Sequence, residues 1–173
     1  MTKVTQVCLS LVISFLFCAT AFSQHRTPLM KAVDFAKKTT PQFEKTDLFE
    51  LNGSLESYPD LRAGLAKGTI LKIDETKLIS TTQKGSETME FVIPRDGESP
   101  LVLELVQKSP LADGFRVTTS RSNGEAVDYT PGVHYRGVVK NVGRSLAAVS
   151  IFEDRVMAVL AVQGIGNVVL GKL

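Results

Sequence analysis

The chain has 173 residues, 43% of them hydrophobic, so it is long enough for one domain with its own hydrophobic core. Its 20 basic and 18 acidic residues nearly balance, which argues against binding to nucleic acid or to an anionic membrane through charge. It has no Trp and three Tyr, a composition that disfavours the exposed aromatic platforms with which secreted β-domains often bind carbohydrate.

The first 23 residues have the pattern of a secretory signal peptide. After a short positive start, residues 7–21 are almost all apolar, and Ala21 and Ser23 place small residues three and one before a cleavage site. This run of about 15 residues is shorter than the ~20 that a membrane-spanning helix needs. We therefore expect export, cleavage between Ser23 and Gln24, and a secreted mature chain that is not anchored in a membrane.

Both cysteines, Cys8 and Cys18, lie inside this signal segment. The exported chain would therefore contain no thiol and form no disulfide, although its compartment would permit one. Its stability has to come from a hydrophobic core.

One helix is predicted near the start of the mature chain. In residues 27–38, Thr27 is a candidate N-cap, Pro28 occupies the first helical position, and apolar side chains recur at helical spacing. We treat residues 24–46 as this helix and a linker. A second, short helix is expected around residues 61–67, in the least regular part of the sequence.

From residue 47 to residue 173, short apolar runs alternate with turn signals that contain Gly, Pro, Asn or Asp. The first four apolar runs cover residues 48–51, 89–93, 101–106 and 115–119. No long helix is predicted between them. This pattern indicates a mainly β domain over residues 47–173, built as an antiparallel β-sandwich or sheet.

The last third of this domain predicts a β-meander. Residues 145–152 place small and apolar side chains on both faces of a strand, which is typical of a central strand. Turn signals at residues 153–154 and 163–166 separate it from two further strands. Within this meander we expect Val149 and Phe152 to be core residues.

Two glycines of the same region are expected to be structural. Gly166 is expected in a turn with positive φ, where Ala would strain the backbone. Gly137 interrupts the apolar strand of residues 133–139, so it is expected at a bulge or at a close approach by a neighbouring side chain.

Several motifs follow one another along this region. They are Phe91-Val92-Ile93-Pro94-Arg95-Asp96-Gly97, Tyr135-Arg136-Gly137, a Ser-led strand with Ser145, Ser150 and Phe152, the turn Glu153-Asp154, and Gly166-Asn167-Val168-Val169-Leu170-Gly171. In this order they resemble the propeptides of secreted reprolysin-like, or adamalysin-type, zinc metalloproteases. The resemblance covers about residues 88–173.

The resemblance implies that the chain is part of a longer precursor, and that its partner is the catalytic domain of that precursor. Such a domain assists the folding of the protease and covers its active-site cleft until it is removed. Zinc is expected only in the downstream protease. Some members of the family silence their zinc with a propeptide cysteine, but the exported chain has none, so latency here would be steric or would use another ligand.

The chain itself contains no pattern of a catalytic or metal site. Its two histidines, His25 and His134, lie far apart in sequence, and there is no His-Glu-x-x-His helix. Gly164-Ile165-Gly166 is followed by a strand and not by the helix that a dinucleotide loop needs. We therefore expect no enzyme activity, no metal and no cofactor in this chain. The alternative function is a secreted β-sandwich binding or adhesion module with no protease attached.

Overall fold

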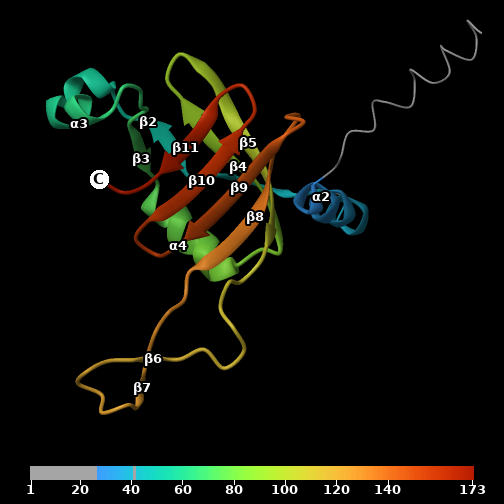
Figure 1. Cartoon of the computed structure of the whole chain (residues 1–173), viewed down its shortest axis with the longest axis vertical. Helices are drawn as coiled ribbons and strands as arrows, with labels where there is room; N and C mark the ends of the chain where they lie inside the picture. Colours follow the sequence, from blue (N-terminus) through green and yellow to red (C-terminus); the bar gives the residue numbers. More distant parts are fainter. Residues whose placement is uncertain (1–26, 41) are drawn as a thin grey trace, which may run out of the picture.

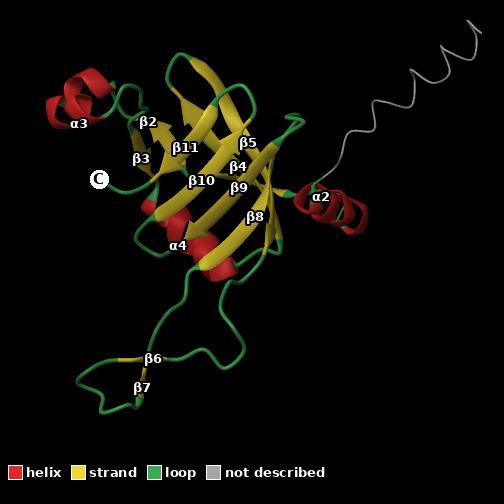
Figure 2. Cartoon of the chain, viewed as in Figure 1, coloured by secondary structure: helices red, strands yellow, loops and turns green. Residues whose placement is uncertain are grey.

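The structure is a computed structural model of the whole chain and describes residues 27–40 and 42–173. The predicted signal peptide and its cleavage site at Ser23 and Gln24 lie outside the described residues. The fold is mainly β, as predicted, with a seven-stranded sheet in the order β1-β4-β5-β8-β9-β10-β11 (Figures 1 and 2). These strands are β1 (Glu44–Asp47), β4 (Thr88–Arg95), β5 (Glu98–Gln107), β8 (Val133–Val139), β9 (Ser145–Ile151), β10 (Val156–Val162) and β11 (Gly166–Leu170).

The sequence analysis predicted an antiparallel sheet, but the sheet is mixed. From β4 to β11 each neighbouring pair is antiparallel, but β1 pairs with β4 in parallel, with Thr46 opposite Phe91. Parallel neighbours need a long crossover connection, and here the chain between them forms β2, β3 and two helices. Because β1 begins at Glu44, the predicted linker contributes the first residues of the sheet.

The predicted N-terminal helix is confirmed as α2 (Pro28–Thr39), which packs on the outer face of the sheet against β5 and β8. The Thr27 hydroxyl caps it by accepting a hydrogen bond from the Met30 amide at 3.3 Å. Val33 and Ala36 form the buried side of this helix. The Lys37 ammonium lies 2.6 Å from the buried carboxylate of Glu104 in β5, so an ion pair joins the helix to the sheet.

The inner face of the sheet is covered by a layer that contains one helix missed by the sequence analysis. This helix is α4 (Glu75–Lys84); the Asp74 side chain caps its first turn, and Gly85 ends it with φ 53°. Its Leu78 lies in the hydrophobic core. Beside it, β2 (Phe49–Leu51) and β3 (Leu71–Ile73) form a two-stranded antiparallel ladder. The segment between β2 and β3 contains a 3-10 turn, η1 (Leu55–Ser57), and α3 (Pro59–Gly64), which corresponds to the short helix expected around residues 61–67.

The hydrophobic core lies between this layer and the inner face of the sheet. Phe91 in β4 is fully buried, and its ring meets that of Phe49 edge to face at 5.9 Å. The core extends across all the middle strands through Leu103, Tyr135 and Val149, which have exposed fractions of 1% or less. The buried side chains of distant segments therefore hold one continuous domain together.

The predicted meander is confirmed, since β8, β9, β10 and β11 follow one another as antiparallel neighbours. Val149 is buried as predicted, but the prediction for Phe152 is wrong. Phe152 follows the end of β9 and is half-buried, and it lies on the opposite face from Val149. Side chains alternate between the two faces of a strand, so Val149 lies on the inner face and Phe152 on the outer face. Only the inner face of β9 is covered.

The prediction of positive φ at Gly166 is confirmed, whereas the prediction for Gly137 is confirmed only in part. Gly166 has φ 98°, a conformation that favours glycine. A Cβ added to Gly137 would collide with the carbonyl oxygen of Glu104 in the neighbouring strand β5. The close approach is made by backbone and not by a side chain, so Gly137 lets β8 lie against β5.

Candidate binding surface

The residues that carried the family resemblance do not converge on one site. The inner face and the turn beside it contain Tyr135, Gly137 and Ser145. The outer side contains Ser150 and Phe152. Each of these residues has a structural contact.

Tyr135 and Ser145 hold the inner side of the meander. The Tyr135 hydroxyl donates a hydrogen bond to the Ser86 carbonyl oxygen at 3.0 Å, and burial together with the Glu44 carboxylate raises its pKa to about 12. The buried Ser145 hydroxyl accepts a hydrogen bond from the Val139 amide at 2.9 Å and so closes the turn between β8 and β9. Both side chains stabilise the fold.

On the outer side, Ser150 and Phe152 surround His134. The Nδ1 atom of His134 lies 2.9 Å from the Ser150 hydroxyl, and its ring meets the Phe152 ring edge to face at 5.9 Å. Partial burial lowers the pKa of His134. The Arg155 guanidinium lies 4.8 Å from the centre of the Phe152 ring. This cluster closes one end of the meander.

The described residues offer no group of three His, Cys, Asp or Glu side chains that could hold a metal ion. No helix in residues 27–40 or 42–173 is long and apolar enough to cross a membrane. The structure does contain two apolar features that the sequence analysis did not identify, one on each face of the sheet.

The first feature, which we call the outer apolar strip, lies on the face of β9, β10 and β11 that α2 leaves uncovered. It consists of Leu146, Ala148, Met157, Val159, Ala161 and Val169. Register places them side by side, because Ala148 is opposite Val159, which is opposite Val169.

The strip is exposed. None of the outward-facing residues of β9, β10 and β11 is charged. Leu146 is 44% exposed, Met157 50%, Val159 53% and Val169 74%. On the neighbouring strands the same face is either covered by α2 or paired through charges, such as Lys140 with Glu90. Contiguous exposed apolar surfaces are typical of sites that interact with proteins, membranes or ligands.

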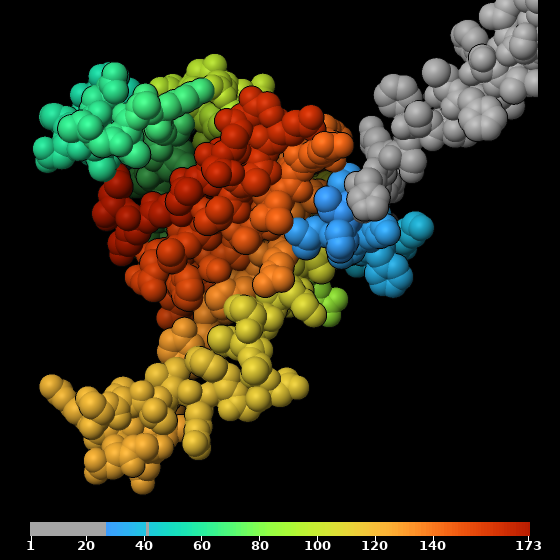
Figure 3. Space-filling model, in the orientation of Figure 1, coloured from blue at the N-terminus to red at the C-terminus, as the bar shows by residue number. Residues whose placement is uncertain are grey.

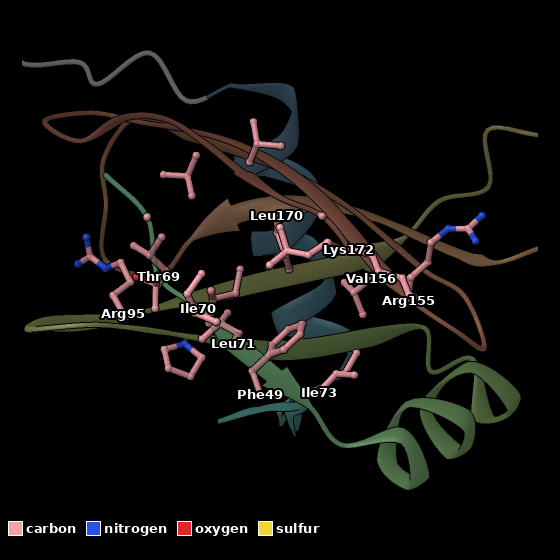
Figure 4. Close-up of a pocket in the computed structure, with 18 of the residues that line it drawn as sticks. Phe49, Thr69, Ile70, Leu71, Ile73, Arg95, Arg155, Val156, Leu170 and Lys172 are labelled. Carbon is pink, nitrogen blue, oxygen red and sulfur yellow. The ribbon is translucent and has the colours of Figure 1, made fainter. Parts of the chain in front are cut away.

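The second feature is a cavity of about 1070 Å³ between the inner face of β10 and β11 and the β2–β3 layer (Figure 4). Phe49, Ile70 and Leu71 line it on one side, and Val156 and Leu170 on the other (Figure 4). Most of its lining is apolar.

Charged side chains surround this cavity in ion pairs. Lys67 and Arg95 both pair with Glu98, and Lys172 lies 3.7 Å from Asp154. Lys67 and Arg95 share the single carboxylate of Glu98, and Lys172 shares that of Asp154 with Arg155, so the cations outnumber the carboxylates in these pairs. The two hydrogen-bonded cations lower the pKa of Glu98.

Comparison of the chain with protein-family models, with curated proteins and with solved structures gives no match.

Proposed function

We propose that this chain is a secreted propeptide-like domain that assists the folding of a downstream zinc metalloprotease and keeps it latent by steric occlusion. Its partner is the catalytic domain of the same precursor. The zinc belongs to that protease, and the exported chain contributes neither a catalytic group nor a cysteine switch.

The order of the motifs supports this proposal. Tyr135 and Gly137 lie in β8, the Ser-led motif fills β9, the Glu153-Asp154 turn joins β9 to β10, and the last motif is β11 with its flanking residues. The first motif, Phe91 to Gly97, lies in β4 and the turn after it, whereas the other motifs cover four consecutive strands that form one structural unit. The residues of these other motifs hold the meander together, as expected for motifs that specify a fold.

The outer apolar strip is the observation that most favours a protein partner. It lies on three of the same four strands, and a domain with a complete core elsewhere gains nothing in stability from exposing it. Binding through such a face requires no thiolate on the zinc, which agrees with the lack of cysteine in the exported chain. Occlusion of the cleft then depends on a folded domain held in place by its interface.

The test is a titration of the mature protease with the separately produced exported domain. We expect stoichiometric inhibition, a complex in size-exclusion chromatography, and no effect of thiol-modifying reagents. Met157→Ser and Val169→Ser should each weaken inhibition by about tenfold or more, because both remove exposed apolar contact area from the strip.

Leu51→Ser is the matched control. Leu51 in β2 is 51% exposed, close to the value for Met157, but it lies outside the strip. This variant should inhibit as the unaltered domain does. Equal inhibition by all variants would exclude the strip as the interface.

The gene provides an independent test, because the reading frame is expected to continue past residue 173 into a His-Glu-x-x-His protease. The alternative, a secreted binding or adhesion module, uses the same strip for another partner. A reading frame without a protease, together with a domain that inhibits none, would favour that module.

A further inference from the structure

Residues 108–132, which connect β5 to β8, form an arm that projects from the body of the domain. Figure 3 shows it standing away from the packed strands. It contains β6 (Val117–Thr118) and β7 (Ala126–Val127), which pair only with each other, through two residue pairs. At its base, the Lys108 amide donates a hydrogen bond to the His134 carbonyl oxygen at 2.8 Å, so the arm begins and ends at one point of the sheet.

Two exposed arginines, Arg116 and Arg121, lie in this arm. The other arginines in the described part of the chain belong to the body of the domain. They lie in α3, at the end of β4, in β8, in the short β8–β9 turn and beside Phe152, as Arg62, Arg95, Arg136, Arg144 and Arg155. An endoprotease needs several extended, accessible residues around the bond that it cuts. The arm can open to provide them without unfolding the hydrophobic core.

Of the two, Arg121 is in the better position. Arg116 immediately precedes β6, so a cut there requires the β6–β7 ladder to open. Arg121 lies in the turn at the tip, beyond the ladder. That turn is closed by hydrogen bonds of the Ser122 hydroxyl with the backbone of Thr119 and Glu125. Two backbone hydrogen bonds, from the Ser122 amide to the Thr119 carbonyl and from the Glu125 amide to the Ser122 carbonyl, also close it. All of them lie in the exposed tip, where solvent can replace them when the turn opens.

We propose that the Arg121–Ser122 peptide bond is a processing site for an arginine-specific endoprotease, which cuts the domain internally and leaves its sheet assembled. The reaction is hydrolysis: water adds across the bond, the C–N bond breaks, Arg121 gains a carboxylate and Ser122 an amino group. No other reactant is needed.

The topology determines the consequence of the cut. Residues up to 121 include α2, α4 and β1, β4 and β5, while residues from 122 include β8 to β11. The two parts stay paired along β5 and β8, from Leu103 opposite Val139 to Gln107 opposite Tyr135, and α2 packs on both strands. The cut therefore converts one chain into a two-part complex, whose stability depends on its concentration.

Limited digestion of the exported chain with an arginine-specific endoprotease tests this proposal. Mass spectrometry should find first products that end at Arg121 and begin at Ser122. They should elute together at the volume of the intact domain and separate in urea. The thermal midpoint of the cut protein should fall on dilution, whereas that of the intact protein should not.

Arg121→Gln should slow the first cut by about tenfold or more, because the side chain that the protease recognises is removed without any loss of packing. Arg144→Gln is the matched control, since Arg144 is also exposed in a turn, and it should leave the rate unchanged. A first cut after Arg116, Arg144 or Arg155 would overturn the proposal. Separation of the two parts without denaturant would overturn it as well.

Discussion

Truncation of two phenylalanines to alanine should have very different effects on stability. Phe91 is fully buried in the core, where its ring contacts that of Phe49, so Phe91→Ala leaves a cavity there. Such changes cost about 3–5 kcal/mol in the free energy of unfolding. Phe152 is half-buried at the end of β9, where water fills the space that a smaller side chain leaves.

The cost of Phe152→Ala follows from its contacts. Loss of partial burial costs about 1 kcal/mol, and loss of the Arg155 guanidinium over the ring costs about 0.5–1 kcal/mol. We therefore expect a total of about 1.5–2 kcal/mol, clearly below the cost of about 3–5 kcal/mol for Phe91→Ala.

Urea unfolding of the exported domain measures both values by linear extrapolation, with an unchanged slope as the control for two-state behaviour. Equal losses for the two variants would mean that Phe152 is a core residue after all, and the assignment of the faces of β9 would then be wrong.

Three further predictions follow from individual residues. Gly137→Ala should cost about 3 kcal/mol or more, because its Cβ meets the backbone of β5, while Gly143→Ala, in a turn with open space, should be nearly neutral in the same unfolding assay. Burial lowers the pKa of His134 below its ordinary value of 6.5, so the unfolded chain binds the proton more readily. Stability is therefore full above that value and falls as the pH drops below it, and His134→Gln should reduce the loss measured between about pH 7.5 and pH 5.5. Export should remove the first 23 residues, so N-terminal sequencing of the secreted protein should begin at Gln24, and an uncut soluble product would contradict this.

Local features of the sequence determined much of the fold. Thr27 and Pro28 specify the start of α2, because capping and a fixed φ act within one helical turn. Alternation and turn residues specified the meander, and Gly166 could be assigned to a turn because its neighbours on both sides read as strands. The helix α4 could have been found in the same way, since Asp74 and Gly85 are a cap pair that spans it.

Only the tertiary structure decided which faces are covered. Alternation shows which residues of β9 share a face, but the helix α2 packs on β5 and β8. The outer apolar strip therefore stays exposed, and Phe152 is only half-buried. The parallel pairing of β1 with β4 likewise joins residues that are distant in sequence, and no local pattern in Glu44–Asp47 indicates it. The same is true of Gly137, whose role depends on the carbonyl group of Glu104 in another strand. Sequence patterns report interactions between near neighbours, whereas docking of whole elements depends on long-range packing.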